Sequence, residues 1–228
     1  MMRRNIALIP AAGVGARFGA GKPKQYVEIN GKTVLQYAIE IFEQHPRIDL
    51  IAVILSPEDS VFQTALSEKV RVFRVGGASR AETVRNGVSV LLEQGLAEAQ
   101  DNILVHDAAR CCLPAEALTR LLDEAGENDE GGILAIPVAD TLKRADGSHH
   151  IDETVARAGL WQAQTPQLFQ TALLNRALSV DDLSEITDEA SAVEKLGIRP
   201  RLVQGDTRNL KLTLPQDEYI VRLLLKAV

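Results

Sequence analysis

Short aliphatic segments alternate with helical patterns from residue 5 to residue 138, and this alternation constrains the fold more than any other feature of the chain. Apolar runs of strand length, rich in Ile, Val and Leu, lie at 5–10, 50–55, 70–75, 102–105 and 133–138. Helical patterns lie between them, at 34–42, in a segment that opens with Ser56-Pro57-Glu58-Asp59, at 81–92 and at 114–122. The alternation predicts an α/β protein with a mostly parallel sheet, helices on both faces and ligands bound at the carboxyl ends of the strands.

A single domain is the simplest organisation for this chain. Its 228 residues are enough to bury one sizeable core. They are 46% hydrophobic but only 4% aromatic, a composition that favours an aliphatic parallel sheet over an aromatic-rich sandwich. No repeat, low-complexity tract or linker divides the sequence, so we expect residues 1–228 to form one domain.

One polar segment, at about 138–161, breaks the alternation. It contains a turn signal, Asp146-Gly147-Ser148, between two extended stretches, which predicts a β-hairpin. The flanking residues offer little apolar surface to bury on the core, so we expect the hairpin to project as an arm and to need a partner. The alternative is a mobile surface hairpin.

Charge and hydropathy exclude several classes of function. A net charge of -6 argues against a broad nucleic-acid surface, and the longest apolar runs are too short to span a bilayer. The first four residues, Met-Met-Arg-Arg, lead directly into the first predicted strand and do not resemble a signal peptide. Cys111 and Cys112 are adjacent, which suits a disulfide poorly and agrees with a reducing compartment. We therefore expect a cytoplasmic protein without nucleic-acid or membrane partners.

A glycine-rich loop, PAAGVGARFGAGKPKQY (10–26), follows the first predicted strand. Its glycines let backbone N–H groups approach an anion closely, and Arg17, Lys22 and Lys24 add positive charge. This combination suits a triphosphate whose negative charge grows during a reaction. A solvated basic loop is the alternative.

Two familiar phosphate-binding motifs do not fit this loop. Gly13 and Gly15 begin a dinucleotide fingerprint, but Phe18 stands where its third glycine belongs. The P-loop pattern fails as well, because Lys22 is followed by Pro23 instead of Ser or Thr. The loop therefore has to be interpreted from its charges and glycines alone.

Two more turns follow predicted strands. Gly76-Gly77 permits a close backbone turn against a flat base, with the Thr83 hydroxyl nearby, although the glycines by themselves favour an ordinary turn. Asp107 lies just beyond a buried strand, where its carboxylate can accept hydroxyl groups or hold a Mg²⁺ that bridges phosphates. His106 should point to the opposite side and serve the core or support the site.

Seven segments together resemble the 2-C-methyl-D-erythritol 4-phosphate cytidylyltransferases of the non-mevalonate isoprenoid pathway. They are the loop 10–26, GGASRAETV, VHDAARC, DTLKR, GLWQAQTPQLF, TDEASAVE and NLKLT, and they cover essentially the whole chain in the order and spacing of that family. The resemblance implies a Rossmann-like nucleotidyltransferase fold. It also implies that CTP and the substrate react with Mg²⁺ to give a cytidine diphospho-sugar alcohol and pyrophosphate.

Residue roles follow from matching this sequence to the family's motifs. The catalytic pair corresponds to Arg17 and Lys24. The nucleotide-binding positions correspond to Ala11, Ala12, Gly13, Gly15, Lys24, Gly77, Ala78, Thr83, Asp107 and Ala108. Ala78 stands where some members have an acidic residue, so only its backbone is expected to contact the cytosine.

The substrate side follows from the same match. The substrate-binding positions correspond to Asp107, Arg110, Thr141, Arg157, Thr165, Thr187 and Lys211, with Asp107 also the candidate metal ligand. Thr187 lies in TDEA, which is also an ordinary helix start. In the family the arm crosses to a second subunit, so the resemblance implies a homodimer with exchanged arms in which Thr141 and Arg157 serve the partner's site.

Other functions remain open at the level of the sequence. A cytidylyltransferase for ribitol 5-phosphate or another polyol phosphate would need the same chemistry. A dinucleotide-binding oxidoreductase is disfavoured by the misplaced third glycine and by the lack of an acidic ribose anchor at the usual spacing. A nucleotide-binding module without catalysis is disfavoured by the presence of both Arg17 and Lys24.

Overall fold

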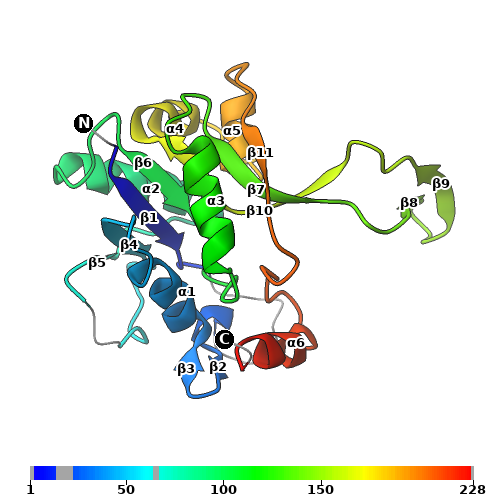
Figure 1. The fold of residues 1–228 in the computed structure, drawn as a ribbon, viewed down its shortest axis with the longest axis horizontal. Helices are drawn as coiled ribbons and strands as arrows, with labels where there is room; N and C mark the ends of the chain where they lie inside the picture. Colours follow the sequence, from blue (N-terminus) through cyan, green and yellow to red (C-terminus); the bar gives the residue numbers. More distant parts are fainter. Residues whose placement is uncertain (1–2, 14–22, 64–66, 227–228) are drawn as a thin grey trace.

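The central feature of the structure, a computed structural model that describes residues 3–13, 23–63 and 67–226, is a seven-stranded sheet in the order β11-β7-β10-β6-β1-β4-β5 (Figure 1). These strands are β1 (Asn5–Pro10), β4 (Leu50–Ile54), β5 (Val70–Phe73), β6 (Asn102–Val105), β7 (Gly132–Pro137), β10 (Trp161–Gln170) and β11 (Arg201–Gln204). Strand β10 is antiparallel to β6 and β7, and the other neighbours are parallel. The predicted mostly parallel α/β fold is confirmed, and the five predicted strands agree with the observed ones to within two residues.

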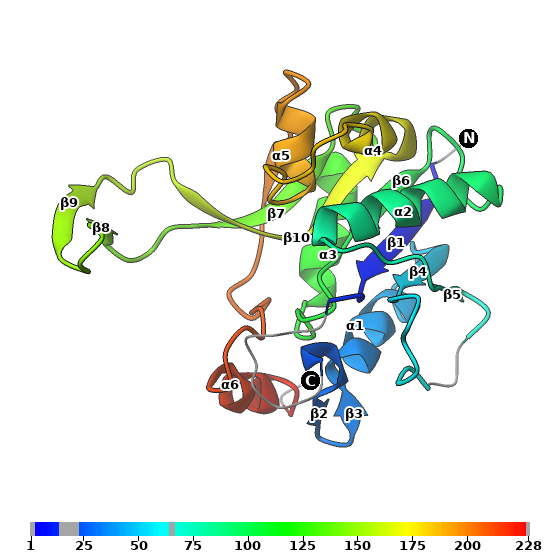
Figure 2. The ribbon, with the colours of Figure 1, turned by 180° about the vertical axis from the view of Figure 1, so that it is seen from behind.

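Helices cover both faces of the sheet. Helices α1 (Val34–Glu43) and α3 (Ala115–Ala125) pack on one face, in front of the sheet in Figure 1. Helices α2 (Arg80–Glu93), α4 (Thr171–Leu178) and α5 (Glu189–Glu194) pack on the opposite face, which is turned toward the viewer in Figure 2. Successive residues of β1 face opposite sides, so that Ala7 packs under α1 and α3 while Leu8 packs under α2. This double burial is why the strands are continuously apolar.

The helix predicted to open at Ser56 is wrong for the described residues 56–63. They form a turn in which the Asp59 N–H donates to Ser56 O at 3.0 Å. The Asp59 carboxylate then accepts the N–H groups of Val61 and Phe62 and the hydroxyl of Tyr26. An aspartate that takes these local and distant donors stabilises the turn in place of a helix.

The polar segment forms the predicted projecting hairpin. Strands β8 (Leu142–Ala145) and β9 (Ile151–Val155) pair only with each other and extend far from the main sheet (Figures 1 and 2). Every residue from 139 to 163 is exposed except Leu142 and Val155, which are half-buried and lie opposite each other in the ladder. We call residues 138–161 the arm.

The C-terminal segment packs beside the start of α1. Helix α6 (Asp217–Leu224) lies near the small hairpin of β2 (Glu28–Ile29) and β3 (Lys32–Thr33), which follows a short 3-10 turn at Lys24–Tyr26. Leu212 and Val221 are buried in one apolar cluster with Ile29 and Val34. This packing brings the segment around Lys211 back to the edge of the sheet near β1 and β6. In the described parts of the chain, no helix has both the length and the apolar character needed to cross a membrane.

Candidate active site

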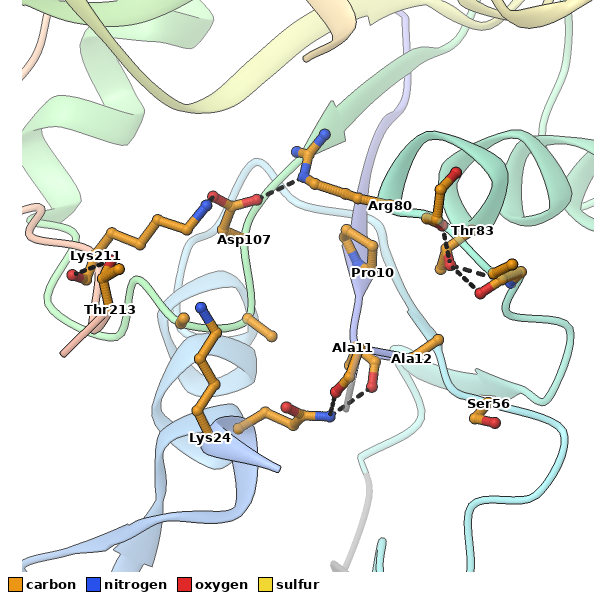
Figure 3. Close-up of a pocket in the computed structure, with 17 residues that line it drawn as sticks. Pro10, Ala11, Ala12, Lys24, Ser56, Arg80, Thr83, Asp107, Lys211 and Thr213 are labelled. Atoms are coloured by element: carbon orange, nitrogen blue, oxygen red, sulfur yellow. Dashed lines mark hydrogen bonds and ion pairs between the residues drawn. The ribbon is translucent and has the colours of Figure 1, made fainter. Parts of the chain in front are cut away.

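A cavity of about 680 Å³ lies where β1, β4 and β6 end, at the carboxyl edge at which ligands are expected. Five segments supply its wall: the end of β1 with the 3-10 turn, Ser56 after β4, the start of α2, the loop after β6, and the segment around Lys211 (Figure 3). Ten of the predicted site residues line it, namely Ala11, Ala12, Gly13, Lys24, Gly77, Ala78, Thr83, Asp107, Ala108 and Lys211.

Gln25 fixes the edge of the cavity that follows β1. Its side-chain amide donates to Ala11 O and to Gly13 O, both at 2.9 Å. The two bonds join the end of β1 to the turn that carries Lys24, and the Lys24 side chain points into the cavity toward the side of Asp107 (Figure 3). Gly15 and Arg17, which were predicted for the same loop, lie outside the described residues.

The start of α2 forms the opposite wall. The Thr83 hydroxyl donates to Ser79 O at 2.9 Å and accepts the Gly77 N–H at 3.1 Å. A carboxylate oxygen of Glu82 accepts the Ala78 N–H at 2.8 Å. Both backbone donors expected to read a base are therefore occupied by side chains of α2, and Glu82 would have to move for a base to take the Ala78 N–H.

Gly76 allows this wall to approach β4. A Cβ atom at Gly76 would lie 2.7 Å from Leu55 O, a distance that real Cβ atoms do not tolerate. The glycine is thus required by a close backbone approach, and this explanation holds whether or not a base binds beside it.

Asp107 is the most strongly paired carboxylate of the cavity. Its Oδ1 accepts from Arg80 Nε at 2.8 Å, and its Oδ2 accepts from Lys211 Nζ at 2.8 Å. Arg110 Nε lies 3.8 Å from the same Oδ2. Burial alone would raise the pKa of Asp107, but Arg80, Lys211 and Arg110 hold it well below its usual range. Asp107 is therefore an ionised carboxylate at neutral pH.

A buried glutamate stands behind Arg80. The Glu189 side chain is only 1% exposed, and its two oxygens accept from Arg80 Nη1 at 2.6 Å and Nη2 at 3.0 Å. Burial raises the pKa of Glu189, while the Arg80 charge opposes that shift.

Thr165 and His106, both buried, form a hydrogen-bonded pair that holds the backbone of Asp107. The Asp107 N–H donates to the Thr165 hydroxyl oxygen at 3.0 Å, and that hydroxyl lies 3.1 Å from His106 Nδ1. His106 Nε2 lies 2.8 Å from Arg110 O, which can only accept, so Nε2 carries the proton and Nδ1 accepts from Thr165. Burial lowers the pKa of His106 to about 4. The histidine supports the site from the core, as expected.

The remaining predicted substrate residues lie apart from the cavity of their own chain. Arg110 is directed away by a 2.6 Å hydrogen bond from Nη1 to Asn209 O. Thr187 is exposed and precedes Asp188, which is the residue that caps α5. Thr141 and Arg157 are exposed on the arm. One chain therefore brings together the nucleotide-side residues with Asp107 and Lys211, but not those of the arm.

The cavity can be tested for the divalent metal that the resemblance implies. Within the described ranges, no group of three His, Cys, Asp or Glu side chains is arranged to hold a metal ion. Asp107 offers one ionised carboxylate on the described wall. Because Mg²⁺ at nucleotide sites is bound by one or two carboxylates together with substrate phosphates, this donor fits a metal that arrives with a nucleotide.

Sequence reasoning missed three polar residues that shape the cavity. Arg80 and Gln25 stand inside segments already singled out, GGASRAETV and KPKQY, but no local pattern shows what they bind. Glu189 was taken as an ordinary first-turn acid of a helix. Its burial against a residue 109 positions earlier leaves no signal in the neighbouring sequence.

Comparison with known proteins gives a uniform result. Residues 5–227 match the family model described as 2-C-methyl-D-erythritol 4-phosphate cytidylyltransferase. A protein of that name from Neisseria meningitidis serogroup A is 70% identical over 100% of both chains, and one from Chromobacterium violaceum is 49% identical over 97% of this chain and 98% of its own. A crystal structure of 4-diphosphocytidyl-2C-methyl-D-erythritol synthase shares the fold with a TM-score of 0.89 at 64% identity, covering 99% of this chain and 100% of that one.

Proposed function

The chain belongs to the 2-C-methyl-D-erythritol 4-phosphate cytidylyltransferase family and is thus a nucleotidyltransferase, and from this premise we propose how its residues carry out the reaction. The substrates are CTP and 2-C-methyl-D-erythritol 4-phosphate. The products are 4-diphosphocytidyl-2-C-methyl-D-erythritol and pyrophosphate. The observation that carries the proposal is the cavity itself, in which Lys24 and Lys211 approach one space beside the end of β1.

The chemical step is a direct displacement at phosphorus. A phosphate oxygen of the polyol phosphate attacks the α-phosphorus of CTP, a new P–O bond forms, and the bond from the α-phosphorus to the bridging oxygen of pyrophosphate breaks. The attacking group is already an anion at neutral pH, so no general base is required. What the site must supply is positive charge around the crowded phosphorus, and Lys24 and Arg17 are the residues for that role.

Backbone and hydroxyl groups hold the nucleotide. The N–H groups after β1, at Ala11, Ala12 and Gly13, receive the phosphates together with Gly15, and the turn at Gly77 and Ala78 with Thr83 receives the cytosine. Asp107 and Ala108 lie on the side of the ribose. Mg²⁺ bound by Asp107 and the CTP phosphates would neutralise part of the triphosphate charge.

The polyol phosphate is bound by two chains. Asp107, Arg110, Thr165, Thr187 and Lys211 come from one subunit. Thr141 and Arg157 come from the arm of the other, in a homodimer with exchanged arms. The support for this arrangement is that the arm is exposed along its length and carries two residues that its own cavity does not contain.

The two free cysteines, Cys111 and Cys112, support a reducing, cytoplasmic location.

The test is a substrate matrix. The protein is incubated with each of the four NTPs, Mg²⁺ and a series of polyol phosphates, and pyrophosphate release is measured. CTP with 2-C-methyl-D-erythritol 4-phosphate should give the highest rate, and EDTA should abolish it. Faster turnover of ribitol 5-phosphate would contradict the substrate assignment, and release with ATP or GTP but not CTP would contradict the cytosine site. No release with any pair would leave a nucleotide-binding module without catalysis.

A further inference from the structure

Three of the five N–H donors of the Arg80 guanidinium bind carboxylates of its own chain. Nη1 and Nη2 bind the two oxygens of buried Glu189, and Nε binds Oδ1 of Asp107. A forked pair of this kind fixes the orientation of the guanidinium plane as well as its position. Arg80 lines the cavity, but its positive charge is already matched by two negative ones.

These contacts continue to a residue of the substrate side. Oδ2 of Asp107 accepts from Lys211 Nζ at 2.8 Å, so Glu189, Arg80, Asp107 and Lys211 form one chain of ion pairs. Figure 3 shows its last three members, Arg80, Asp107 and Lys211. The chain joins the first residue of α5, the first residue of α2, the loop after β6 and the C-terminal segment. Four segments that are distant in sequence are thereby held in one arrangement.

We infer that Arg80, held by Glu189, is a positioning residue that sets the orientation of Asp107 and Lys211 for the polyol phosphate. The inference rests on the proposed function. A direct role for Arg80 as a phosphate ligand is disfavoured, because its charge and three of its five N–H donors are already taken by Glu189 and Asp107.

Loss of Arg80 should affect one substrate more than the other. Without the bond to Nε, the Asp107 carboxylate is free to turn toward Lys211 and Arg110, and among the described residues Arg110 Nε is a buried donor without a hydrogen-bond partner. Arg110 is then drawn onto Asp107, to which Lys211 is already bonded, and both cations are held away from the incoming phosphate. Of the groups proposed for CTP, those at Ala11–Gly13 and Thr83 make no contact that passes through the Arg80 side chain, whereas Asp107 is bonded to it directly.

Three variants and one control separate positioning from simple stabilisation. Arg80→Gln should raise KM for the polyol phosphate by about tenfold or more and should raise KM for CTP, which also depends on Asp107, by less. It should lower Tm because Glu189 loses its partner. Glu189→Gln should shift the same KM in the same direction by less. Arg85→Gln is the matched control, since Arg85 lies on the same helix and contacts Glu82 outside the cavity at 3.7 Å.

The double variant Arg80→Gln/Glu189→Gln is decisive. It removes both buried charges, so Tm should recover relative to Arg80→Gln, while KM for the polyol phosphate should stay high because nothing holds Asp107. If KM recovers together with Tm, or if Arg80→Gln raises both KM values equally, Arg80 only stabilises the fold and the inference is overturned.

A second readout does not depend on the proposed reaction. In protein labelled with ¹⁵N-arginine, the Arg80 Nε–H signal should exchange slowly with water in the wild type and rapidly in Glu189→Gln, with Arg85 Nε–H fast in both. A fast Arg80 signal in the wild type would overturn the inference even in an active enzyme. A slow signal in a protein that turns over no polyol phosphate would instead refute the proposed function alone.

Discussion

The wall of the cavity and the arm are built in opposite ways, although both carry residues proposed to bind the same phosphate. At the cavity, Asp107 and Glu189 are buried and each is bonded to cations from distant parts of the same chain. On the arm, the charged pairs join neighbours across the hairpin, such as Arg144 Nε with a Glu153 oxygen at 2.7 Å. The cavity is held in place by its own chain, whereas in the described ranges the strands of the arm, β8 and β9, pair with each other and with no other strand. The difference indicates which half of the site needs a second subunit.

The largest expected difference between the two regions concerns stability. Ile51 is fully buried in β4 and Ile151 is 67% exposed in β9. Ile51→Ala should lower the free energy of unfolding by about 4 kcal/mol, and Ile151→Ala should change it by no more than about 0.5 kcal/mol. Both values are measured by urea denaturation. Any effect of Ile151→Ala should depend on protein concentration, since it would act through the dimer. Equal costs at all concentrations would show that the arm packs on its own core.

His106, which lies behind Asp107, should contribute to the dependence of stability on pH. Burial lowers the pKa of His106 from 6.5 to about 4, so between these values the unfolded chain binds a proton that the folded chain does not. Protonation of His106 in the unfolded chain therefore leaves the free energy of unfolding unchanged above pH 6.5. It lowers that free energy by about 3 kcal/mol as the pH falls toward 4. Urea denaturation from pH 7 to pH 4 should show a weaker pH dependence for His106→Gln than for the wild type. Identical slopes would refute this.

Catalysis should depend on the cations beside the glycine-rich loop. Lys24→Ala or Arg17→Ala should each lower kcat by on the order of a hundredfold or more, about 2.7 kcal/mol, because one charge-stabilising group is lost. The Tm should barely change. Lys32→Ala is the matched control, since Lys32 pairs with Glu40 at 2.8 Å and does not line the cavity. Near-normal turnover of the Lys24 variant, or loss of its fold, would contradict the assigned role.

The smallest expected effect is on substrate binding by the arm, where Arg157 can be compared with Arg144. Arg157→Ala should raise KM for the polyol phosphate by about tenfold, which corresponds to about 1.4 kcal/mol, and leave KM for CTP unchanged. Arg144→Ala, on the same hairpin, should change neither value because Arg144 pairs with Glu153 within the arm. Equal effects of the two substitutions would mean that the arm acts through its charge in general.

The sequence predicted the parts of the fold whose cause is local. The strand at 5–10 could be recognised because both of its faces are buried, which makes the run continuously apolar. Strand β10 was missed because its sequence, WQAQTPQLFQ, is rich in glutamine. Gln164 and Gln167 are buried there only because Asp206 O and the start of α5 satisfy their amides. Such burial depends on partners far along the chain, so no local pattern reveals it.

The residues of the site also divide into those that local sequence could predict and those that it could not. Lys24 and Asp107 could be chosen because each follows a predicted strand in a loop with unusual composition. Arg80 and Glu189 could not be paired, since 109 residues separate them and each has an ordinary role at its helix start. Motif resemblance found the residues of the arm, and their distance from the cavity of their own chain agrees with the hairpin predicted to project from the core.

The central claim, that each active site combines the cavity of one chain with the arm of another, can be tested by subunit mixing. Arg157→Ala chains, which have the raised KM, and nearly inactive Lys24→Ala chains are unfolded and refolded together, and turnover is measured at a polyol phosphate concentration well below the wild-type KM. Under random two-fold assembly about half of the dimers are hybrids, and each hybrid has one site with both substitutions and one with neither. About a quarter of all sites should therefore regain wild-type turnover. No recovery, with hybrids verified by native mass spectrometry, would contradict the exchanged arm and leave 138–161 as a mobile surface hairpin.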